Sequence, residues 1–182
     1  MKSITEIALA LALGFGSSFA QQGSRLAGAG AFKVSSPAFA PGGEIPAQYT
    51  CKGSDESPPL EWSGAPAKTA AFALILDDPD APGGTWVHWV MWNLPAGVTS
   101  VSQGVPRTER LDNGAGQGRN SFRKIGYNGP CPPGRATHRY VFHLYALDAK
   151  LDLAPGANRS QLDSAMQGHI LAQTEYMGTF HR

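Results

Sequence analysis

The chain has 182 residues, which is long enough for one domain with a hydrophobic core of its own. Its 15 Lys and Arg residues nearly balance its 14 Asp and Glu residues, so the formal net charge is only +1. This balance excludes the basic footprint of a nucleic-acid-binding protein and a strong electrostatic attraction to an acidic membrane surface.

The N-terminus has the organisation of a secretory signal peptide over residues 1–20. A short basic start at Lys2 precedes an apolar stretch over residues 7–15 and a small-x-small cleavage site at residues 18–20. Glu6 is an unfavourable acidic residue at the edge of the apolar stretch. We expect cleavage after this segment, and therefore an exported protein that is either periplasmic or secreted.

The alternative to a signal peptide is a membrane anchor, which needs about 20 consecutive apolar residues. Glycine and serine over residues 14–18 interrupt the apolar stretch too early for an anchor, and no later segment is long and apolar enough to span a bilayer. We expect a loose tether rich in Gly, Ala and Ser over residues 21–31, followed by a single domain over residues 32–182.

Segments typical of strands, separated by turns rich in Pro and Gly, dominate the domain. We expect strands over residues 32–40, 60–62, 72–76, 85–94, 139–147 and 174–180. The third of these is continuously apolar, which predicts a central strand that is buried on both faces. One helix is expected over residues 160–169, with Asn158 or Ser160 as its N-cap. This pattern predicts an antiparallel β-sandwich with one or two short helices.

Residues 96–123 form a long polar region with glycines at positions 104, 114, 116 and 118. Clusters of glycine and polar residues are typical of loops. We therefore expect a surface excursion here and not a second domain.

Two loop-to-strand junctions carry most of the polar groups that could do chemistry. The first is the turn over residues 77–84, which holds three aspartates and two prolines between two apolar strands. The second runs over residues 126–134 and leads into His138, Arg139 and Tyr140 at the start of another strand. Both junctions stand at the edge of a core, so we expect them to form one site.

Strand alternation assigns the side chains of these junctions to faces. In the strand after the acidic turn, the expected faces are Trp86, His88, Val90 and Trp92 on one side and Val87, Trp89, Met91 and Asn93 on the other. In the next long strand, His138 and Tyr140 share a face, while His143 lies on the opposite face and is expected to be structural. His88 could be an ordinary core histidine, but its place beside the acidic turn favours a role in the site.

The candidate site residues are Asp78, Asp80, His88, His138 and Tyr140, with Gly129 and Gly134 around them. Two imidazoles, a phenol and free backbone amides are good donors to a small anion such as a phosphate or a carboxylate. An aspartate fits such a pocket if it holds an imidazole, because this fixes the tautomer, raises the pKa and leaves an N–H directed outward. The prolines of both loops lower the entropic cost of binding.

Two other kinds of site stay open. A hydrolase would need a nucleophile; the chain has no Gly-x-Ser-x-Gly elbow, and the candidate is therefore Cys131 paired with His138. A metal site could use His88, His138 and an aspartate as a two-His-one-carboxylate set, although no local spacing such as HExxH supports it. We expect neither a metal nor a cofactor.

The two cysteines, Cys51 and Cys131, bear on the hydrolase hypothesis. In an oxidising compartment a pair of thiols usually forms a disulfide, and closing a loop of this length would stabilise the fold by roughly 4 kcal/mol in the chain-entropy model. The alternatives are two free thiols or a metal site, which lacks any C-x-x-C spacing. We expect the disulfide, which would silence Cys131 as a nucleophile.

The chain resembles the phosphatidylethanolamine-binding protein family, also called Raf kinase inhibitor proteins, and in particular the bacterial branch named for YbhB and YbcL. The resemblance rests on DPDAP at residues 78–82, W-x-H-W at 86–89, and GPCPPG with HRY within 129–140. Looser similarity covers SPPLEW at 57–62 and YALD at 145–148, so that it extends over most of the domain.

This resemblance implies a Greek-key β-sandwich with a small anion-binding cavity at one end. Carried over by motif, the cavity residues would be Asp78, Pro82, His88, Pro132, His138 and Tyr140, with Trp86 as a wall and Asp80 supporting the turn. Family members are described as binding phospholipid head groups such as phosphatidylethanolamine, or phosphorylated groups. Some inhibit kinases or proteases.

Three features set this chain apart from the animal members of the family. The export signal makes inhibition of cytosolic kinases unexpected, and the disulfide would stiffen the rim of the pocket. No room remains after His169 for the long C-terminal helix of the animal proteins, so we expect a more open pocket.

We therefore expect a non-enzymatic binding protein for a small phosphorylated or carboxylated ligand. One alternative is a secreted inhibitor of a protease or another enzyme that acts through loops such as residues 104–123. A second alternative is an ester hydrolase that uses the Asp/His pocket. A protein partner and a dimer stay open.

Overall fold

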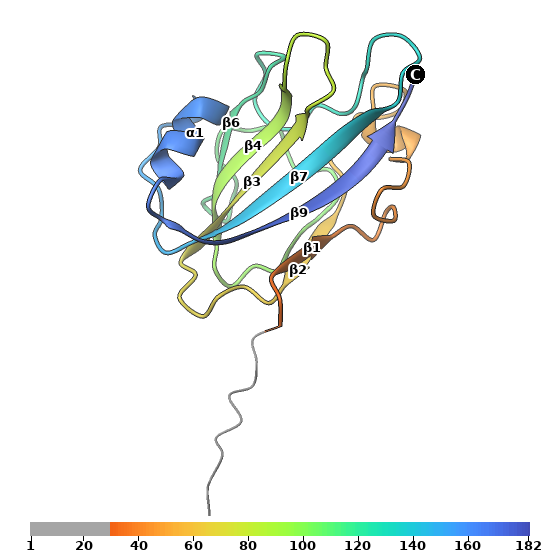
Figure 1. Cartoon of the computed structure of the whole chain (residues 1–182). Helices are drawn as coiled ribbons and strands as arrows, with labels where there is room; N and C mark the ends of the chain where they lie inside the picture. The colour runs from red at the N-terminus through yellow and green to blue at the C-terminus, as the bar shows by residue number, and fades with distance from the viewer. Residues whose placement is uncertain (1–29) are drawn as a thin grey trace, which may run out of the picture.

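The computed structural model describes residues 30–182, which fold into strands with two short helical segments (Figure 1). In chain order the elements are β1 (Lys33–Ser35), η1 (Ala47–Tyr49), β2 (Leu60–Ser63), β3 (Ala71–Asp78), β4 (Trp86–Pro95), β5 (Ser100–Val101), β6 (Gly116–Arg119), β7 (His138–Leu147), β8 (Gly156–Asn158), α1 (Arg159–Met166) and β9 (Ile170–Phe180). The predicted signal peptide, residues 1–20, and most of the predicted tether lie outside the described residues.

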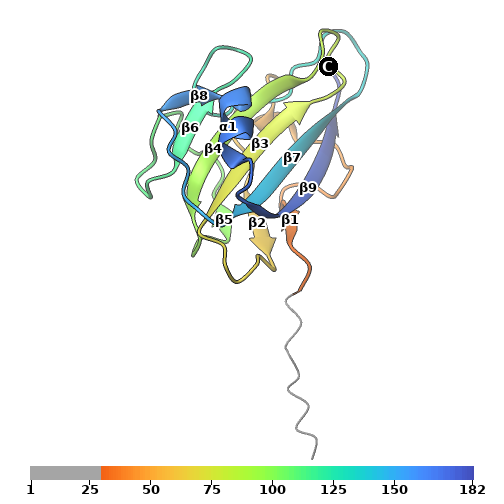
Figure 2. The ribbon, with the colours of Figure 1, turned by 60° about the vertical axis from the view of Figure 1, so that its left-hand side comes forward.

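The strands form two sheets. The larger sheet has the order β8-β6-β4-β3-β7-β9, and the smaller one the order β1-β2-β5. Neighbouring strands are antiparallel except for β6 and β8, which are parallel. The smaller sheet covers one face of the larger sheet and α1 covers the other (Figures 1 and 2). The predicted β-sandwich with short helices is confirmed, with the correction that one strand pair is parallel.

Strand β3 lies at the centre of the larger sheet, and all of its residues are buried. On one face, Leu74 and Leu76 pack in a core with Trp62 of the smaller sheet. On the other face, Ala73 and Ile75 pack in a second core that includes residues of α1. Burial of one such Leu or Ile side chain contributes roughly 1.5–3 kcal/mol. The continuous apolar run therefore becomes a doubly covered strand, as predicted.

The ends of several elements differ from the prediction. The strand expected over residues 32–40 is only three residues long. The helix begins after the predicted cap Asn158, whose side chain accepts the Gln161 N–H in a capping box, but it ends at Met166. Gly168 then adopts a left-handed conformation with φ of +80°, which reverses the chain. Strand β9 can therefore begin at residue 170, earlier than expected.

The region over residues 96–123 is not only a surface excursion, because its glycines form the largely buried strand β6 beside β4. A Cβ at Gly116 would lie 2.5 Å from the Trp92 ring, and one at Gly118 would lie 2.1 Å from the carbonyl oxygen of Ala157. These glycines therefore allow close packing. Between them, the buried Gln117 accepts the indole N–H of Trp89 at 2.7 Å.

Two irregularities in β4 overturn the predicted alternation of its side chains. Opposite β3, Leu76 pairs with Trp89 and Asp77 pairs with Val87, so His88 has no partner in the ladder. A bulge of this kind places one extra residue in one strand and changes the face toward which its side chain points. Trp89 packs in the core under the smaller sheet, and the His88 ring contacts Tyr140 of that same core.

The second irregularity in β4 lies opposite Ala73 and involves Trp92 and Asn93. Val90 and Trp92 pack in the core on the α1 face, with Val87 beside them. The faces that were predicted from strict alternation are therefore wrong in two respects. Val87 and Trp89 lie on different faces, and His88 lies on the face of Trp89 and not on that of Val90 and Trp92. No helix within residues 30–182 is long and apolar enough to cross a membrane.

Candidate functional site

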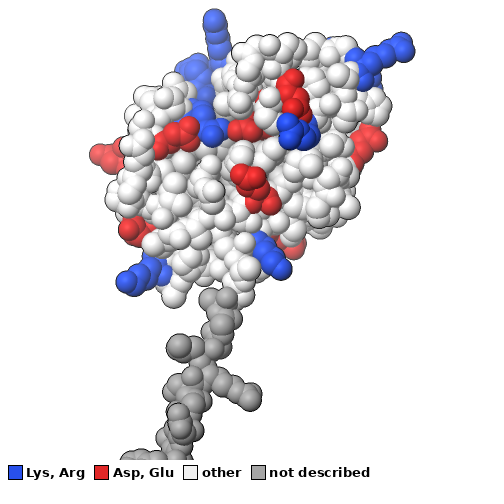
Figure 3. All heavy atoms as spheres, viewed as in Figure 1, with Lys and Arg blue, Asp and Glu red and all other residues white. Residues whose placement is uncertain are grey.

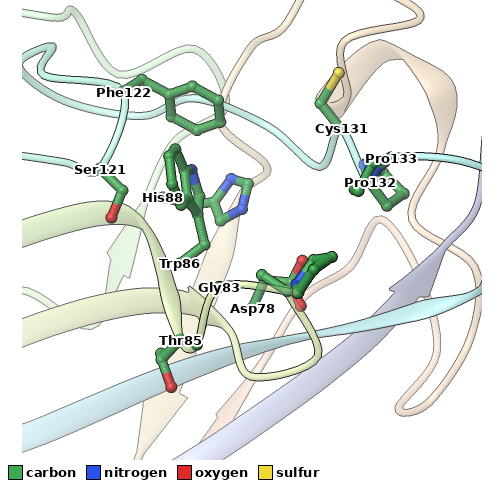
Figure 4. A pocket seen from close by; sticks show the side chains of 13 residues that line it. Asp78, Gly83, Thr85, Trp86, His88, Ser121, Phe122, Cys131, Pro132 and Pro133 are labelled. Atoms are coloured by element: carbon green, nitrogen blue, oxygen red, sulfur yellow. The ribbon is translucent and has the colours of Figure 1, made fainter.

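A pocket of about 510 Å³ lies at the end of the sandwich where the β3–β4 turn meets the loops that precede β7. Its lining residues are Asp78, Ala81, Pro82, Gly83, Gly84, Thr85, Trp86, His88, Ser121, Phe122, Cys131, Pro132 and Pro133. Figure 4 shows His88 and Asp78 on one side of this space, with Cys131 and the two prolines across it. The two junctions that were singled out in the sequence therefore meet, as expected.

Asp78 is the last residue of β3, and its carboxylate is buried beside the pocket. Its Oδ2 accepts a hydrogen bond from Nδ1 of His138 at 2.7 Å, and its Oδ1 accepts the Asp80 N–H at 2.9 Å. Because a carboxylate only accepts, the first bond places a proton on Nδ1 of His138. The carboxylate is thus held in place by the turn and by the first residue of β7.

His88 is buried, and the bulge in β4 directs its ring toward the pocket between Phe122 and Asp78 (Figure 4). Its Nδ1 donates to the carbonyl oxygen of Asn128 at 2.7 Å, because a carbonyl oxygen can only accept. Burial lowers the pKa of His88, and the carbonyl groups of Asn128 and Gly129 and the charge of Asp78 oppose this only in part. The ring is therefore neutral near pH 7, and its Nε2 is a hydrogen-bond acceptor.

The predicted aspartate-bound imidazole is present at His138 but not at His88. The carboxylate of Asp78 holds His138, whereas a backbone carbonyl holds His88. A bond to a neutral carbonyl does not raise the pKa as a carboxylate does. His88 thus offers a lone pair where a donor was expected.

The Tyr140 hydroxyl is buried and has no hydrogen-bond partner among the described residues. The Tyr140 ring packs edge-on against the His88 ring, with 5.3 Å between the centroids. Burial raises the pKa of Tyr140, as do the charge and the close approach of the Asp78 carboxylate, so the hydroxyl keeps its proton; it also lies near the backbone of Cys131, but with regular hydrogen-bond geometry to neither group. A buried polar group without a partner costs about 1–3 kcal/mol, which makes this hydroxyl an unused donor next to the pocket.

Aromatic rings and prolines make the walls of the pocket. Trp86, which is 39% exposed, packs edge-on against Phe122 at 5.4 Å, and Phe122 packs against His88 at 5.3 Å. Pro132 and Pro133 lie on the other side (Figure 4). Ser121 and Phe122 were missed from the sequence. Their signal was weak, because one aromatic residue within a polar region is common on surfaces.

Buried asparagines hold the loop that carries Phe122. The Asn120 amide donates to the carbonyl of Gly126 and to the side chain of Asn128, both at 2.9 Å. Its carbonyl oxygen accepts the backbone N–H groups of Phe122 and Lys124. Asn120 thus places Phe122 against the same segment that fixes His88.

The far wall of the pocket is attached to the segment around η1. Cys51 and Cys131 form a disulfide with 5.4 Å between their Cα atoms, which confirms the predicted pairing. The Cys51 N–H also donates to the carbonyl of Pro130 at 3.1 Å, and the Gly129 N–H donates to the Asp55 carboxylate at 2.6 Å. In this state Cys131 has no free thiol, so it cannot serve as the nucleophile of the hydrolase hypothesis.

The structure brings Asp78, Pro82, Trp86, His88 and Pro132 together as lining residues. His138 and Tyr140 do not line the pocket, but His138 bonds to Asp78 and Tyr140 packs against His88. All of the residues carried over by motif therefore line the pocket or contact a lining residue.

The predicted supporting residues lie around this group. Asp80 points to Arg139, whose guanidinium lowers the pKa of that carboxyl to about 2. Gly129 is packed so closely that a Cβ would lie 2.2 Å from the carbonyl oxygen of Tyr49, and Gly134 has φ of +75° in an open turn. His143 lies on the opposite face of the sheet, as predicted, between Asp77 and Glu175.

Other features narrow the chemistry of the site. No Lys or Arg is among the residues that line the pocket. Within residues 30–182, no three His, Cys, Asp or Glu side chains are placed to hold a metal ion together. On the face of the molecule shown in Figure 3, acidic and basic side chains are interspersed, without a broad area of one sign.

Sequence and structure comparisons agree on the relatives of this chain. Residues 35–181 match the family model of the phosphatidylethanolamine-binding protein. A UPF0098 protein of Methanothermobacter thermautotrophicus is 48% identical over 145 residues, which cover 80% of this chain and 95% of the relative. A UPF0098 protein of Pyrococcus horikoshii is also 48% identical, over 76% of this chain and 71% of the relative.

Two solved structures share the fold. The protein CT736 of Chlamydia trachomatis, described as a homologue of phosphatidylethanolamine-binding protein, has a TM-score of 0.76 and 40% identity, covering 83% of this chain and 97% of that one. YbcL of E. coli, described as a member of the mammalian family, has a TM-score of 0.77 and 32% identity, covering 83% and 98%. The chain therefore belongs to the phosphatidylethanolamine-binding protein family.

Proposed function

We propose that this protein is an exported, non-enzymatic binding protein whose pocket takes a small phosphorylated or carboxylated group. The observation that carries the proposal is the buried Tyr140 hydroxyl, which has no partner among the described residues and lies beside the pocket. An oxyanion supplies the acceptor that this donor lacks, and binding would offset the cost of leaving it unpaired. The family description names phosphatidylethanolamine, a lipid that contains a phosphate group, which is in line with this ligand chemistry.

The shape of the pocket supports a ligand with a small polar end and an apolar part. The polar groups, Asp78 and His88, are buried, whereas Trp86 is partly exposed. Trp86 and Phe122 would pack against the apolar part of the ligand, and aromatic rings bury a large area at such contacts. The disulfide at Cys131 and the neighbouring prolines hold the opposite wall, which lowers the cost of ordering on binding.

The proposal of a binding protein without catalysis is supported by the absence of an activated nucleophile around the pocket. The sulfur of Cys131 is in a disulfide. The Ser121 hydroxyl accepts the Val87 N–H at 2.9 Å, and no hydrogen bond joins it to a histidine among the described residues. A serine needs an adjacent base to act as a nucleophile.

The test is calorimetric titration of the protein with phenyl phosphate and benzoate, comparing wild type with Tyr140→Phe. Because the hydroxyl makes no bond in the free protein, we expect Tyr140→Phe to be at least as stable as wild type but to bind about tenfold more weakly. Tyr145→Phe is the matched control, since it makes the same change on the same strand within the other core. Its affinity should equal that of wild type.

A second variant makes the test more severe. His88→Ala combined with His138→Ala should abolish binding of both compounds. Inhibition of a partner enzyme that survived this double change would place the function in the surface loops. Turnover of phosphate or carboxyl esters that was lost in His138→Ala would show an enzyme.

Export is tested by the intact mass of the protein purified from its source, because the mature chain should begin near Gln21.

A further inference from the structure

The ring of His88 depends on a single peptide unit, the one between Asn128 and Gly129. The carbonyl oxygen of this unit accepts Nδ1–H of His88 at 2.7 Å, and its N–H donates to the carboxylate of Asp55 at 2.6 Å. All peptide bonds of the described residues are trans, and in a trans peptide unit the C=O and the N–H point in opposite directions. His88 and Asp55 therefore lie on opposite sides of one rigid plane.

The backbone permits two orientations of this peptide unit. Residue 129 is a glycine, which adopts positive and negative φ about equally readily, and a reversal of one peptide plane is what distinguishes two common turn types. In the reversed orientation an N–H would face Nδ1 of His88, so Nδ1 would have to accept and the proton of the neutral ring would lie on Nε2. The orientation of the peptide unit thus decides whether the pocket meets a lone pair or an N–H.

The hydrogen bonds on either side of the peptide unit do not choose between these orientations. The Asn128 N–H donates to the carbonyl of His88 at 3.1 Å, and the carbonyl of Pro130 accepts the Cys51 N–H at 3.1 Å. Both bonds use groups of the neighbouring peptide units. Among the described residues, the acceptor for the N–H of the central unit is the Asp55 carboxylate.

Asp55 is itself held in one conformation. Its φ is +58°, in the left-handed region that costs energy for residues other than glycine and persists where surrounding contacts impose it. Its second carboxylate oxygen accepts the Arg107 guanidinium at 2.7 Å and the Asn128 amide at 3.2 Å, and its carbonyl also accepts from Arg107. The carboxylate is therefore fixed against the buried peptide unit from the solvent side.

We infer that Asp55 is a positioning residue for the pocket: its carboxylate orients the Asn128–Gly129 peptide unit, and this unit keeps the proton of the His88 ring on Nδ1. Asp55 is not among the residues that line the pocket, so it acts through the peptide unit alone. The inference rests on the proposed function, because it concerns the binding pocket. In the alternative state a proton lies on the other ring nitrogen, and no other covalent bond differs.

The experiment is nitrogen NMR of the histidine rings in the ¹⁵N-labelled protein without ligand, because protonated and unprotonated ring nitrogens resonate far apart. Burial lowers the pKa of His88, so its ring is neutral at pH ~7.5. The signals of His88 are assigned by their absence from the spectrum of His88→Gln. In the wild type we expect the Nδ1–H form to exceed the Nε2–H form by at least about tenfold.

Asp55→Gly is the main variant, because glycine accepts the left-handed conformation and lacks the carboxylate. We expect the ratio of the Nδ1–H form to the Nε2–H form to fall by about tenfold or more, since a hydrogen bond to a charged acceptor is lost. Asp55→Asn keeps an oxygen that can accept the Gly129 N–H, so its ratio should lie between those of the wild type and Asp55→Gly.

Glu56→Gly is the matched control. It removes the carboxylate of the next residue, which accepts from Gln103 at the surface at 2.7 Å and does not contact the peptide unit. Its tautomer ratio should equal that of the wild type. An equal fall in Glu56→Gly and Asp55→Gly would overturn the inference, because loosening of the loop would then explain both.

Three other outcomes overturn the inference. The first is a wild-type His88 ring that carries its proton on Nε2. The second is a folded Asp55→Gly with the wild-type ratio, which would leave Asp55 with a structural role only. If Asp55→Gly does not fold, Asp55→Asn decides, and a ratio equal to that of the wild type would overturn the role of the carboxylate.

The proposed function is tested separately, by titration of the wild type with phenyl phosphate and benzoate. If neither compound binds, the proposed function fails, whereas the tautomer ratios of the free protein still decide whether Asp55 sets the state of His88.

Discussion

Asp77 and Asp78 are neighbours at the end of β3, and they stand on opposite faces of the same sheet with different surroundings. Asp77 faces α1, where its carboxylate bonds to Arg159 at 2.6 Å and to His143 at 3.3 Å. Asp78 faces the pocket, where it bonds to His138, and no Arg or Lys is among the residues that line this pocket. The Asp77 carboxylate is paired with Arg159 and His143, whereas the Asp78 carboxylate has a side that faces the pocket and can contact a ligand.

The difference shows what separates a structural ion cluster from a binding site in this fold. Arg159 is also bonded to Asp163 through its Nε, so the cluster on the α1 face satisfies its own charges. Around Asp78, the Tyr140 hydroxyl has no partner among the described residues, and the Nε2 atom of His88 is left with a lone pair. Unused hydrogen-bonding capacity, and not charge as such, marks the pocket side.

The largest effect on stability should come from removal of the disulfide, which lies on the pocket side of the sheet. We expect Cys51→Ser with Cys131→Ser to lower the free energy of unfolding by about 2–4 kcal/mol, because the unfolded chain gains freedom. Chemical denaturation measures this. Hydrogen bonds such as that from the Cys51 N–H to Pro130 should keep the wall in place, so phosphate binding should persist. A loss below about 1 kcal/mol would mean that these bonds suffice.

A second change tests the ion cluster on the α1 face. Asp77→Ala leaves Arg159 with only Asp163 as a partner, so we expect a loss of about 2 kcal/mol in the free energy of unfolding. This figure is reduced from that of a fully buried pair because Arg159 is partly exposed to solvent. Urea denaturation gives the loss, and a phenyl phosphate titration should give an unchanged affinity. Lost binding in a folded variant would show that the two faces are coupled.

The smallest effect concerns the pH dependence of the free energy of unfolding, to which His88 and His143 should contribute with opposite signs. Burial lowers the pKa of His88, so the unfolded chain binds more protons at this position and His88 costs stability as the pH falls below ~6.5. Burial alone would also lower the pKa of His143, but the bonds and charges of Asp77 and Glu175 raise it. The stability from His143 is therefore present below ~6.5 and is lost as the pH rises.

The measurement compares unfolding free energies of wild type, His88→Gln and His143→Gln from pH 5 to 8. The difference between wild type and His88→Gln should rise with pH, and the difference for His143→Gln should fall. Neither slope should exceed about 1.4 kcal/mol per pH unit, which is the limit for one proton. Two slopes of the same sign would contradict the contrast between the two faces.

Prediction from the sequence succeeded where a local pattern was enough. The apolar run before the acidic turn predicted a central strand, and β3 is buried on both faces as predicted. The prediction that His138 and Tyr140 share a face also holds, because the register between β7 and β9 is regular there. It failed at β6, whose glycines make room for the Trp92 ring and the Ala157 carbonyl, and both of these partners lie far away in the chain.

The bulge at His88 shows a second limit of local patterns. The rule that side chains alternate between faces assumes that each residue has one partner on the neighbouring strand. An extra residue in one strand moves the side chains beyond it to the opposite faces. Whether a bulge forms depends on the pairing with β3, which the sequence of β4 does not reveal. The extra residue here turned out to be the histidine of the site.

The sequence by itself determined the family, the sandwich, the cysteine pair and several residues of the pocket, because each depends on residue type and spacing. Only the tertiary structure decided which polar groups of the pocket donate hydrogen bonds and which accept them. The proton on Nδ1 of His88 is placed by the carbonyl of Asn128, which is brought there from 40 residues away. A hydrogen bond to a distant backbone group follows from packing, and packing decides whether a buried imidazole donates or accepts.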